Sequence, residues 1–144
     1  MSEAVIATNC PDLNLLHRGK VRDMYEIPGH EDKLLMVATD RISAYDVVMA
    51  DPIPGKGKVL TEISLFWFKL LGDIVPNHLI SADVDQFPEV CRQYRDQLEG
   101  RTMLVKRTKV VPIECIVRGY LSGSFWSAYK KNTTVCGLDR KSVV

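Results

Sequence analysis

The sequence predicts an α+β fold whose first half is mainly an antiparallel sheet. Short runs of β-branched and other apolar residues, separated by polar turns, indicate strands at residues 13–17, 21–27 and 33–38. The first two runs are joined at Gly19, so they should form a hairpin. A fourth apolar run, residues 42–49, predicts another strand. Consecutive short strands of this kind pair with their neighbours along the chain, which gives an antiparallel sheet.

One long helix follows these strands. From residue 59 the apolar residues recur at helical spacing until Pro76 ends the pattern. The recurring positions are Ile63, Phe66, Trp67, Leu70, Leu71 and Ile74. We expect this helix to pack on the sheet, and we interpret its aromatic residues as core because the helical period accounts for them. A base-stacking platform is the alternative for the same residues.

A shorter helix and two further strands complete the first part of the chain. The shorter helix should begin at Pro88 and end at Gly100, the usual order of these two residues around a helix. Its many charges indicate a solvated face. Apolar segments at residues 78–82 and 102–105 predict one strand before this helix and one after it.

The length of 144 residues allows one ordinary domain, or one domain and the opening of another. We place a domain boundary after the basic segment KRTK, which separates residues 1–109 from residues 110–144. The composition, 46% hydrophobic and 26% charged, is that of a globular protein that can bury a core. A formal net charge of +1 gives no support for nonspecific nucleic-acid binding, which needs a clustered basic surface.

Neither the cysteines nor the apolar segments suggest an extracellular or membrane protein. The cysteines are Cys10, Cys91, Cys115 and Cys136, with no CxxC pair, and the histidines show no metal-ligand spacing relative to them. No apolar stretch approaches the roughly 20 residues of a membrane helix, and residues 1–9 lack the layout of a secretory signal. We therefore expect a cytoplasmic protein with reduced thiols and no membrane partner.

The most informative segment is PIECIVRGYLSGS, residues 112–124. If residues 113–119 are extended, Glu114 and Arg118 share one face, and the Arg118 guanidinium at the strand end can hold phosphate or carboxylate. The opposite, apolar face should be core; it comprises Ile113, Cys115 and Val117. Ser124 precedes a helical pattern, so we expect it to be an N-cap beside an anion site. A structural ion pair and a simple cap remain open alternatives.

The segment RGKVRD, residues 18–23, carries further candidate binding residues. Strand alternation puts three cations on one side, and Gly19 lets a ligand approach the backbone closely. The cations are Arg18, Lys20 and Arg22. Three cations beside a glycine turn attract polyphosphate, although an exposed basic strand gives the same pattern.

Two polar segments after the third predicted strand are also candidates. In DRISAYD, polar side chains gather where a strand ends, a cluster that usually caps a turn: Asp40, Ser43 and Asp46. The segment PIPGKGK, residues 52–58, mixes rigid prolines with glycines and two lysines, which suits a movable cover over an anionic substrate. A plain exposed loop is the alternative for this second segment.

Together these segments resemble the SAICAR synthetase family, the phosphoribosylaminoimidazole-succinocarboxamide synthases of purine biosynthesis. The resembling segments are VVPIECIVRGYLSGS from residue 110, RGKVRDMYEI from residue 18, ATDRISAYDVVMADPIPGKG from residue 38 and TEISLFWFKLL from residue 61. Several ungapped motifs in the family's order are far more specific than one short pattern. The resemblance covers roughly residues 15–138.

The resemblance implies an ATP-binding lobe similar to the N-terminal lobe of kinases, followed by the start of a second α+β lobe. Its implied ATP contacts in the covering loop are Gly19, Lys20, Val21 and Arg22. Main-chain atoms of Lys106 and Val110 would hold the adenine base, and a solvated basic loop is the alternative there. The implied contacts of the imidazole nucleotide are Asp40, Ser43, Arg118 and Ser124, with Asp46 as a further candidate.

The resemblance also implies the chemistry of an ATP-dependent ligase that uses Mg²⁺. ATP would phosphorylate the carboxylate of carboxyaminoimidazole ribonucleotide (CAIR), and the amine of L-aspartate would attack the acyl phosphate to form an amide. No residue stands out as a general base, and the sequence does not identify the metal ligands.

The family's chain continues well beyond the signature segment, whereas this sequence stops at Val144. The resemblance therefore implies a missing second lobe or a partner chain. A noncatalytic nucleotide-binding fragment is the alternative function. A small kinase-like phosphotransferase is disfavoured, because the sequence has no HRD-type catalytic loop and no DFG-type metal motif.

Overall fold

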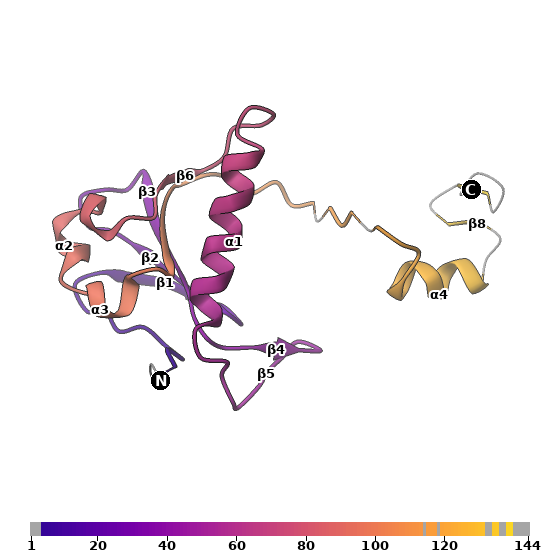
Figure 1. The fold of residues 1–144 in the computed structure, drawn as a ribbon, viewed down its shortest axis with the longest axis horizontal. Helices are drawn as coiled ribbons and strands as arrows, with labels where there is room; N and C mark the ends of the chain where they lie inside the picture. The colour runs from indigo at the N-terminus through magenta and orange to yellow at the C-terminus, as the bar shows by residue number, and fades with distance from the viewer. Residues whose placement is uncertain (1–3, 114, 118, 132–133, 136–137, 140–144) are drawn as a thin grey trace. The chain divides into compact units, whose positions relative to one another are not determined.

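The computed structural model describes residues 4–113, 115–117, 119–131, 134–135 and 138–139, with side chains up to residue 131. The chain divides into two compact units, Met1–Lys109 and Val110–Val144 (Figure 1).

The first unit is built on a five-stranded antiparallel sheet with the strand order β1-β2-β3-β7-β6 (Figure 1). The strands are β1 (Asn14–Arg18), β2 (Arg22–Glu26), β3 (Lys33–Ala38), β6 (Leu79–Ser81) and β7 (Thr102–Lys106). β1 and β2 form a hairpin around Gly19, as predicted, and β3 pairs with both β2 and β7. The predicted α+β class with an antiparallel sheet is therefore confirmed.

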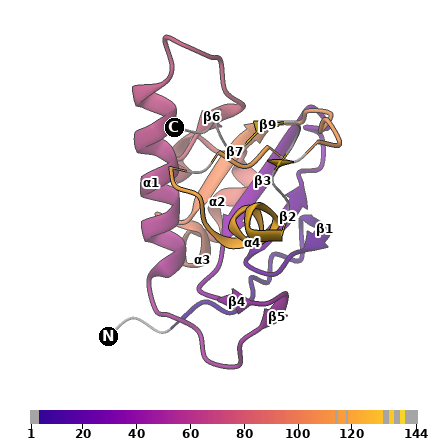
Figure 2. The same ribbon diagram turned by 90° about the vertical axis from the view of Figure 1, so that its right-hand side faces the viewer.

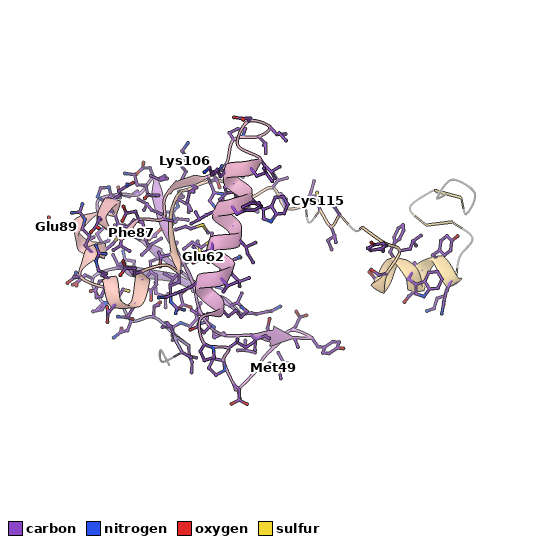
Figure 3. The ribbon with its side chains drawn as sticks, in the orientation of Figure 1. Met49, Glu62, Phe87, Glu89, Lys106 and Cys115 are labelled. Atoms are coloured by element: carbon purple, nitrogen blue, oxygen red, sulfur yellow. The ribbon has the colours of Figure 1, made fainter. Side chains whose placement is uncertain are left out.

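One face of the sheet carries the hydrophobic core. Leu35 and Val37 of β3 point to this face, where they pack with residues from the segment between β6 and β7. That segment contains η1 (Val84–Gln86), α2 (Glu89–Arg92) and α3 (Arg95–Leu98). Phe87, between η1 and α2, has no exposed surface and fills the space under the sheet (Figure 3). Successive side chains of β3 thus alternate between two faces of the sheet. One face is fully buried in this core, and the other is available to the long helix.

The single short helix predicted between Pro88 and Gly100 is two helical turns instead. The break lies at Gln93 and Tyr94, between α2 and α3. Tyr94 packs against the core, and its hydroxyl donates to the Asp12 carboxylate at 2.5 Å. The charge pattern of the segment reveals neither this contact nor the break in the helix.

The opposite face of the sheet is partly covered by α1 (Lys56–Leu70), on the other side of the sheet from α2 and α3 (Figures 1 and 2). The helix begins three residues before the predicted start at residue 59. Gly55 supplies the left-handed backbone at its N-cap, with φ 79°. A Cβ on Gly57 would lie 2.2 Å from the Ala38 carbonyl oxygen, so glycine allows the helix to sit directly against the end of β3.

The apolar stripe of α1 does not face the sheet, and the prediction that its aromatic residues are core is wrong for this structure. Phe66 is 60% exposed and Trp67 is 49% exposed. The buried residues of α1 are the small Gly57 and Thr61 instead, and Leu60 and Ser64 face the sheet beside them. Small side chains allow close approach, and the apolar stripe is left on the outer surface.

The run of residues 42–49 forms a small hairpin rather than one strand. It consists of β4 (Ser43–Ala44) and β5 (Val47–Val48). The two residues between them, Tyr45 and Asp46, have φ of 49° and 66°, the positive values of a tight two-residue hairpin turn. Apolar composition predicted an extended chain here but did not reveal the reversal, since neither turn residue is glycine.

The second unit contains α4 (Gly123–Lys131) and a short hairpin of β8 (Thr134–Val135) and β9 (Leu138–Asp139). The described part of the predicted strand over residues 113–119 is not a strand. Ile113 is 71% exposed and Val117 98%, and Cys115 is exposed too, so these three side chains are not core. Glu114 and Arg118 lie outside the described residues. No helix in the described part of the chain is long and apolar enough to cross a lipid bilayer.

Replacing Gly57 by alanine tests the close contact of α1 with β3. The added Cβ must push the helix away from the Ala38 carbonyl, and we expect a loss of about 1–3 kcal/mol in the free energy of unfolding. Urea denaturation measures it. Glu62→Ala, on the exposed side of the same helix, is the control and should change stability by less than about 0.5 kcal/mol. Equal stability of Gly57→Ala and the wild type would contradict the contact.

Candidate functional site

The turn between β1 and β2 is held by one buried guanidinium. Arg41, which follows β3, donates to the carbonyl oxygens of Gly19 at 2.7 Å, Lys20 at 3.2 Å and Arg22 at 3.2 Å. It also donates to the carbonyl of Ile6 at 2.5 Å. All of these acceptors belong to main chain, so the guanidinium fixes the course of the turn without using a side chain of the turn itself.

Asp23 neutralises this guanidinium inside the protein. Its carboxylate accepts from Arg41 at 2.8 Å and from the Thr8 amide and hydroxyl at 3.0 and 2.8 Å. Both side chains are buried, and Arg18 adds a partly exposed second cation 3.3 Å from the carboxylate. Burial by itself would raise the pKa of Asp23, but the hydrogen bonds from Arg41 and Thr8 outweigh it and hold the pKa below its ordinary value. The pair is therefore charged at neutral pH.

Two amides of the turn are left open by this arrangement. Thr39 donates its amide and hydroxyl to the Val21 carbonyl, so the carbonyls from Gly19 to Arg22 all point to protein donors. Among the residues that the structure describes, the Lys20 and Val21 amides have no acceptor. Adjacent free amides in a tight turn form a concave anion-binding element. The Lys20 and Val21 amides can therefore donate hydrogen bonds to a phosphate oxygen.

Three cations from different segments surround the turn. Lys20 is about half exposed and contacts Asp46 at the tip of the β4–β5 hairpin at 2.5 Å. Arg22 and Lys56 form no ion pair with any described residue. Burial lowers the pKa of Lys56, and the positive charges of Arg22 and Arg41 lower it further. A bound anion would relieve this repulsion.

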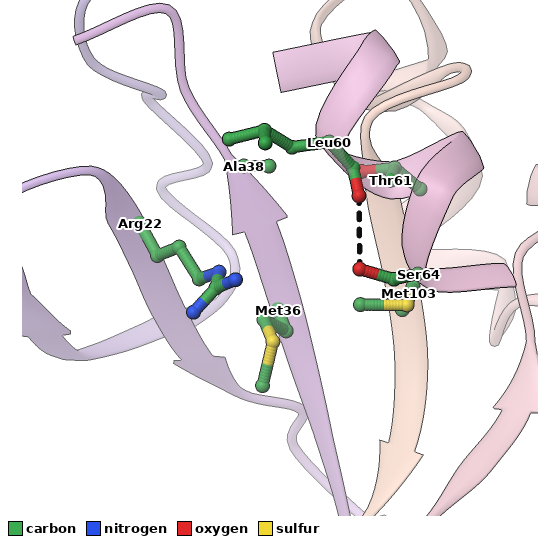
Figure 4. Close-up of a pocket in the computed structure, with 7 residues that line it drawn as sticks. All are labelled: Arg22, Met36, Ala38, Leu60, Thr61, Ser64 and Met103. Atoms are coloured by element: carbon green, nitrogen blue, oxygen red, sulfur yellow. Dashed lines mark hydrogen bonds between the residues drawn. The ribbon is translucent and has the colours of Figure 1, made fainter. Parts of the chain in front are cut away.

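A narrow crevice separates α1 from the sheet next to Arg22 (Figure 4). It is lined by Arg22, Met36, Ala38, Leu60, Thr61, Ser64 and Met103, and the Ser64 hydroxyl donates to the Leu60 carbonyl at its wall. Its empty space of about 200 Å³ has no room for a water molecule. The crevice is therefore a narrow gap in the packing of α1 on the sheet, too small to hold a ligand.

Asp40 has a different place from the one predicted. It is fully buried and accepts from Arg101 at 2.8 Å, from the Gly57 amide at 2.8 Å and from the Val5 amide at 2.9 Å. Burial would raise the pKa of Asp40, but these donors, Arg101 first, lower it below its ordinary value. Because every contact of this carboxylate is internal, the predicted direct contact with substrate does not fit. Asp40 instead caps the N-terminus of α1 and joins it to β7.

The other predicted site residues are scattered over the two units. Ser43 is half-buried in β4, and Lys106 at the end of β7 donates its amide to the His78 carbonyl at 2.8 Å. That bond leaves only the Lys106 carbonyl for an adenine edge. Val110 is exposed and begins the second unit. Ser124 is the second residue of α4 rather than its N-cap, and Arg118 lies outside the described residues.

Sequence reasoning missed the residues that organise the site. Arg41, Asp23 and Arg101 were not assigned a role, although all three are buried ions. The available signal was an Asp–Arg pair directly after a predicted buried strand, since charges there need partners. Lys56 was noticed only as part of a mobile loop, whereas it begins α1.

The described residues contain no group of three or more carboxylate, thiol or imidazole side chains that could hold a metal ion. Burial raises the pKa of the Cys10 and Cys91 thiols to about 11, so both stay protonated at neutral pH and are poor metal ligands. The donor set of the turn is cationic, which suits anions.

Comparison with known proteins decides the family. The family model for SAICAR synthetase matches residues 15–143. The chain belongs to the SAICAR synthetase family. It is 68% identical over 138 residues to the phosphoribosylaminoimidazole-succinocarboxamide synthase of Desulfotalea psychrophila, and 57% identical to that of Geobacter sulfurreducens. These matches cover 96% of this chain and 46% of each relative, so the chain spans about half their length.

Solved structures of SAICAR synthases share the fold. One has a TM-score of 0.85 and the enzyme from Saccharomyces cerevisiae complexed with SAICAR has 0.83. Both are 46% identical to this chain, and each match covers 94% of this chain and 48% of the solved one. The predicted resemblance to the family is confirmed.

The Arg41–Asp23 pair of this SAICAR synthetase family member should be far more important for stability than an exposed pair. Arg41→Ala leaves the buried Asp23 carboxylate without its main partner, and we expect a loss of about 3–5 kcal/mol in the free energy of unfolding. Arg95→Ala is the control, because Arg95 also forms ion pairs, with Asp85 and Glu99, but on the surface, and should cost about 0–1 kcal/mol. Similar losses by urea denaturation would contradict the role of Arg41.

The same pair predicts a stability change in acid. The folded pKa of Asp23 lies below its ordinary 3.8, so its contribution is complete above that pH and is lost as the pH falls through the folded pKa. We expect wild-type stability to fall below about pH 4 more steeply than that of Asp23→Asn, which has no proton to take up. Urea denaturation between about pH 6 and pH 3 measures both slopes. Parallel slopes would show that Asp23 does not contribute.

Proposed function

We propose that the turn between β1 and β2 binds the phosphates of ATP. The observation that carries this proposal is the pair of open amides at Lys20 and Val21, held in place by Arg41 from behind and surrounded by cations. Lys20 would exchange Asp46 for a phosphate, and Arg22 would contact the same group. Gly19 matters because a Cβ there would lie 3.3 Å from the Arg22 carbonyl oxygen, which leaves little room in the turn.

The proposed reaction is that of the family: ATP-dependent joining of L-aspartate to CAIR to give SAICAR. The CAIR carboxylate takes the γ-phosphoryl group of ATP, with release of ADP. The aspartate amine then attacks the carbonyl carbon, and phosphate leaves as the amide forms and the amine loses a proton. Cations at the turn favour the phosphate charge that develops during transfer, and Mg²⁺ would arrive with the ATP phosphates.

For CAIR we propose contacts from Ser43, Arg118 and Ser124, carried over from the family's motifs. Arg118 can bind the phosphate or the carboxylate in bidentate fashion. For the adenine base we propose the Lys106 carbonyl and main-chain atoms of Val110. Asp40 and Arg41 would not touch the ligands: Asp40 positions the start of α1, and Arg41 positions the turn.

A second candidate function follows from the length of the match. The chain spans about half of its relatives, so it can be an ATP-binding part that needs the remainder of the family's polypeptide for catalysis. The two functions differ in their substrate requirement. Only the ligase releases ADP in a manner that depends on both aspartate and CAIR.

Two substitutions test the assignments independently of overall activity. Lys20→Ala should weaken ATP binding by about 10-fold and leave CAIR binding unchanged, because it removes one phosphate contact. Arg118→Ala should do the reverse. Calorimetric titration with each ligand measures both, and each variant is the control for the other. Loss of ATP binding in Arg118→Ala, or unchanged ATP binding in Lys20→Ala, would contradict the proposed division of roles.

A further inference from the structure

The outer surface of α1 carries an apolar seam with the spacing of a helix–helix contact. The seam consists of Val59, Ile63, Phe66 and Leu70, all exposed, with Trp67 beside it. Successive members are four, three and four residues apart, which keeps them on one line along a helix. Such a line over three turns is what two packed helices share at their contact.

This seam is separate from the part of α1 that packs on the sheet. At 100° per residue, Gly57, Thr61 and Ser64 lie on one side of the helix, and Val59, Ile63 and Phe66 lie more than about 100° away. The sheet contact is made by the first side. Packing within the first unit therefore does not explain why the second side is apolar, since a solvated helix face is normally polar.

We propose that this seam binds the same seam of a second copy of the chain, with the two α1 helices antiparallel around a two-fold axis. Along the helix, the axis lies at the level of residues 64 and 65, halfway along the seam. Val59 of each copy then lies opposite Leu70 of the other, and Ile63 lies opposite Phe66. Each layer combines a smaller with a larger side chain, the alternation that lets facing layers interdigitate.

The charges beside the seam fit this pairing. Glu62 and Lys69 flank it on one side, and neither forms an ion pair with a residue that the structure describes. In the antiparallel arrangement Glu62 of one copy comes next to Lys69 of the other, and the symmetry repeats the contact. The pattern is thus complementary to itself. Two parallel helices around a two-fold axis would instead put the copies of these residues on opposite sides of the contact, where Glu62 and Lys69 would not meet.

The ends of the helix extend the contact. A hollow of about 330 Å³ at the start of α1 is lined by Ile53, Pro54, Gly55, Lys56, Val59 and Leu60. Ile74, in the turn after α1, is 79% exposed. The antiparallel arrangement brings Ile74 of one copy to the hollow of the other. This addition matters, because a stable interface buries about 1,200–2,000 Å² in total and one helix pair of three turns is at the lower limit.

Sedimentation velocity of the purified 144-residue chain at about 1–200 µM tests the proposal. We expect a reversible dimer of twice the 16.3 kDa chain mass. Phe66→Asp should abolish the dimer, and circular dichroism should show an unchanged fold because Phe66 is mostly exposed. Glu89→Gln, an exposed residue of α2 on the other side of the sheet from α1, is the control and should leave the dimer intact.

Charge-reversal variants distinguish the antiparallel α1–α1 pairing from other partners of the seam. Glu62→Lys alone and Lys69→Glu alone each place like charges together, and each should weaken the dimer by about 3- to 10-fold. The double variant restores opposite charges and should return the dissociation constant to within about 2-fold of wild type. A double variant weaker than both single ones overturns the antiparallel pairing.

A chain that stays monomeric throughout the concentration range also overturns the proposal. If such a monomer becomes resistant to proteolysis when the remaining part of a relative's polypeptide is added, that part and not a second copy occupies the seam. Dimers that persist in Phe66→Asp would show that another surface mediates association.

Discussion

The proposed site depends on the hydrogen bonds that the buried Arg41 guanidinium donates to the β1–β2 turn. It gathers three carbonyls of the β1–β2 turn and one from the N-terminal segment, and Asp23 supplies the balancing charge. A peptide unit whose carbonyl points inward directs its amide the other way. The open amides of Lys20 and Val21, which we propose as the anion site, are thus a consequence of the cation on the inner side of the turn, and no glycine-rich loop of the common phosphate-binding types is needed.

Asp40 and Arg41 are adjacent in the sequence, but their side chains bind different segments. Asp40 binds Arg101 and the Gly57 amide, which fixes the first turn of α1 against β3 and β7. Arg41 fixes the turn that lies next to it. Two adjacent residues therefore position Lys56, at the start of the helix, relative to Lys20 on the turn. Such buried pairs add little stability over an apolar core, but each specifies one geometry because an unpaired partner would be costly.

Local pattern was sufficient for the five strands of the main sheet, but not for the β4–β5 hairpin, the described part of residues 113–119 or the site. β3 was predicted with its bounds because alternation and flanking polar residues are local signals. The face of α1 that meets the sheet was not, since contact there is made by Gly57 and Thr61, whose small size carries no hydrophobic signal. Asp40 was recognised as special but given the wrong partner. Its ligands come from positions 5, 57 and 101, and sequence spacing does not reveal such long-range pairs.

The proposed phosphate site is preorganised before any ligand binds, and this has an electrostatic cost. Lys20 and Arg22 come from the turn and Lys56 from the start of α1; the pKa of Lys56 is lowered first by burial and then by the charge of Arg22. The fold tolerates these charges because Asp23 and Asp40 neutralise the two buried arginines, Arg41 and Arg101, and leave the outer cations uncompensated apart from Asp46. An anionic ligand would supply the missing charge, so binding energy is available without rearranging the backbone.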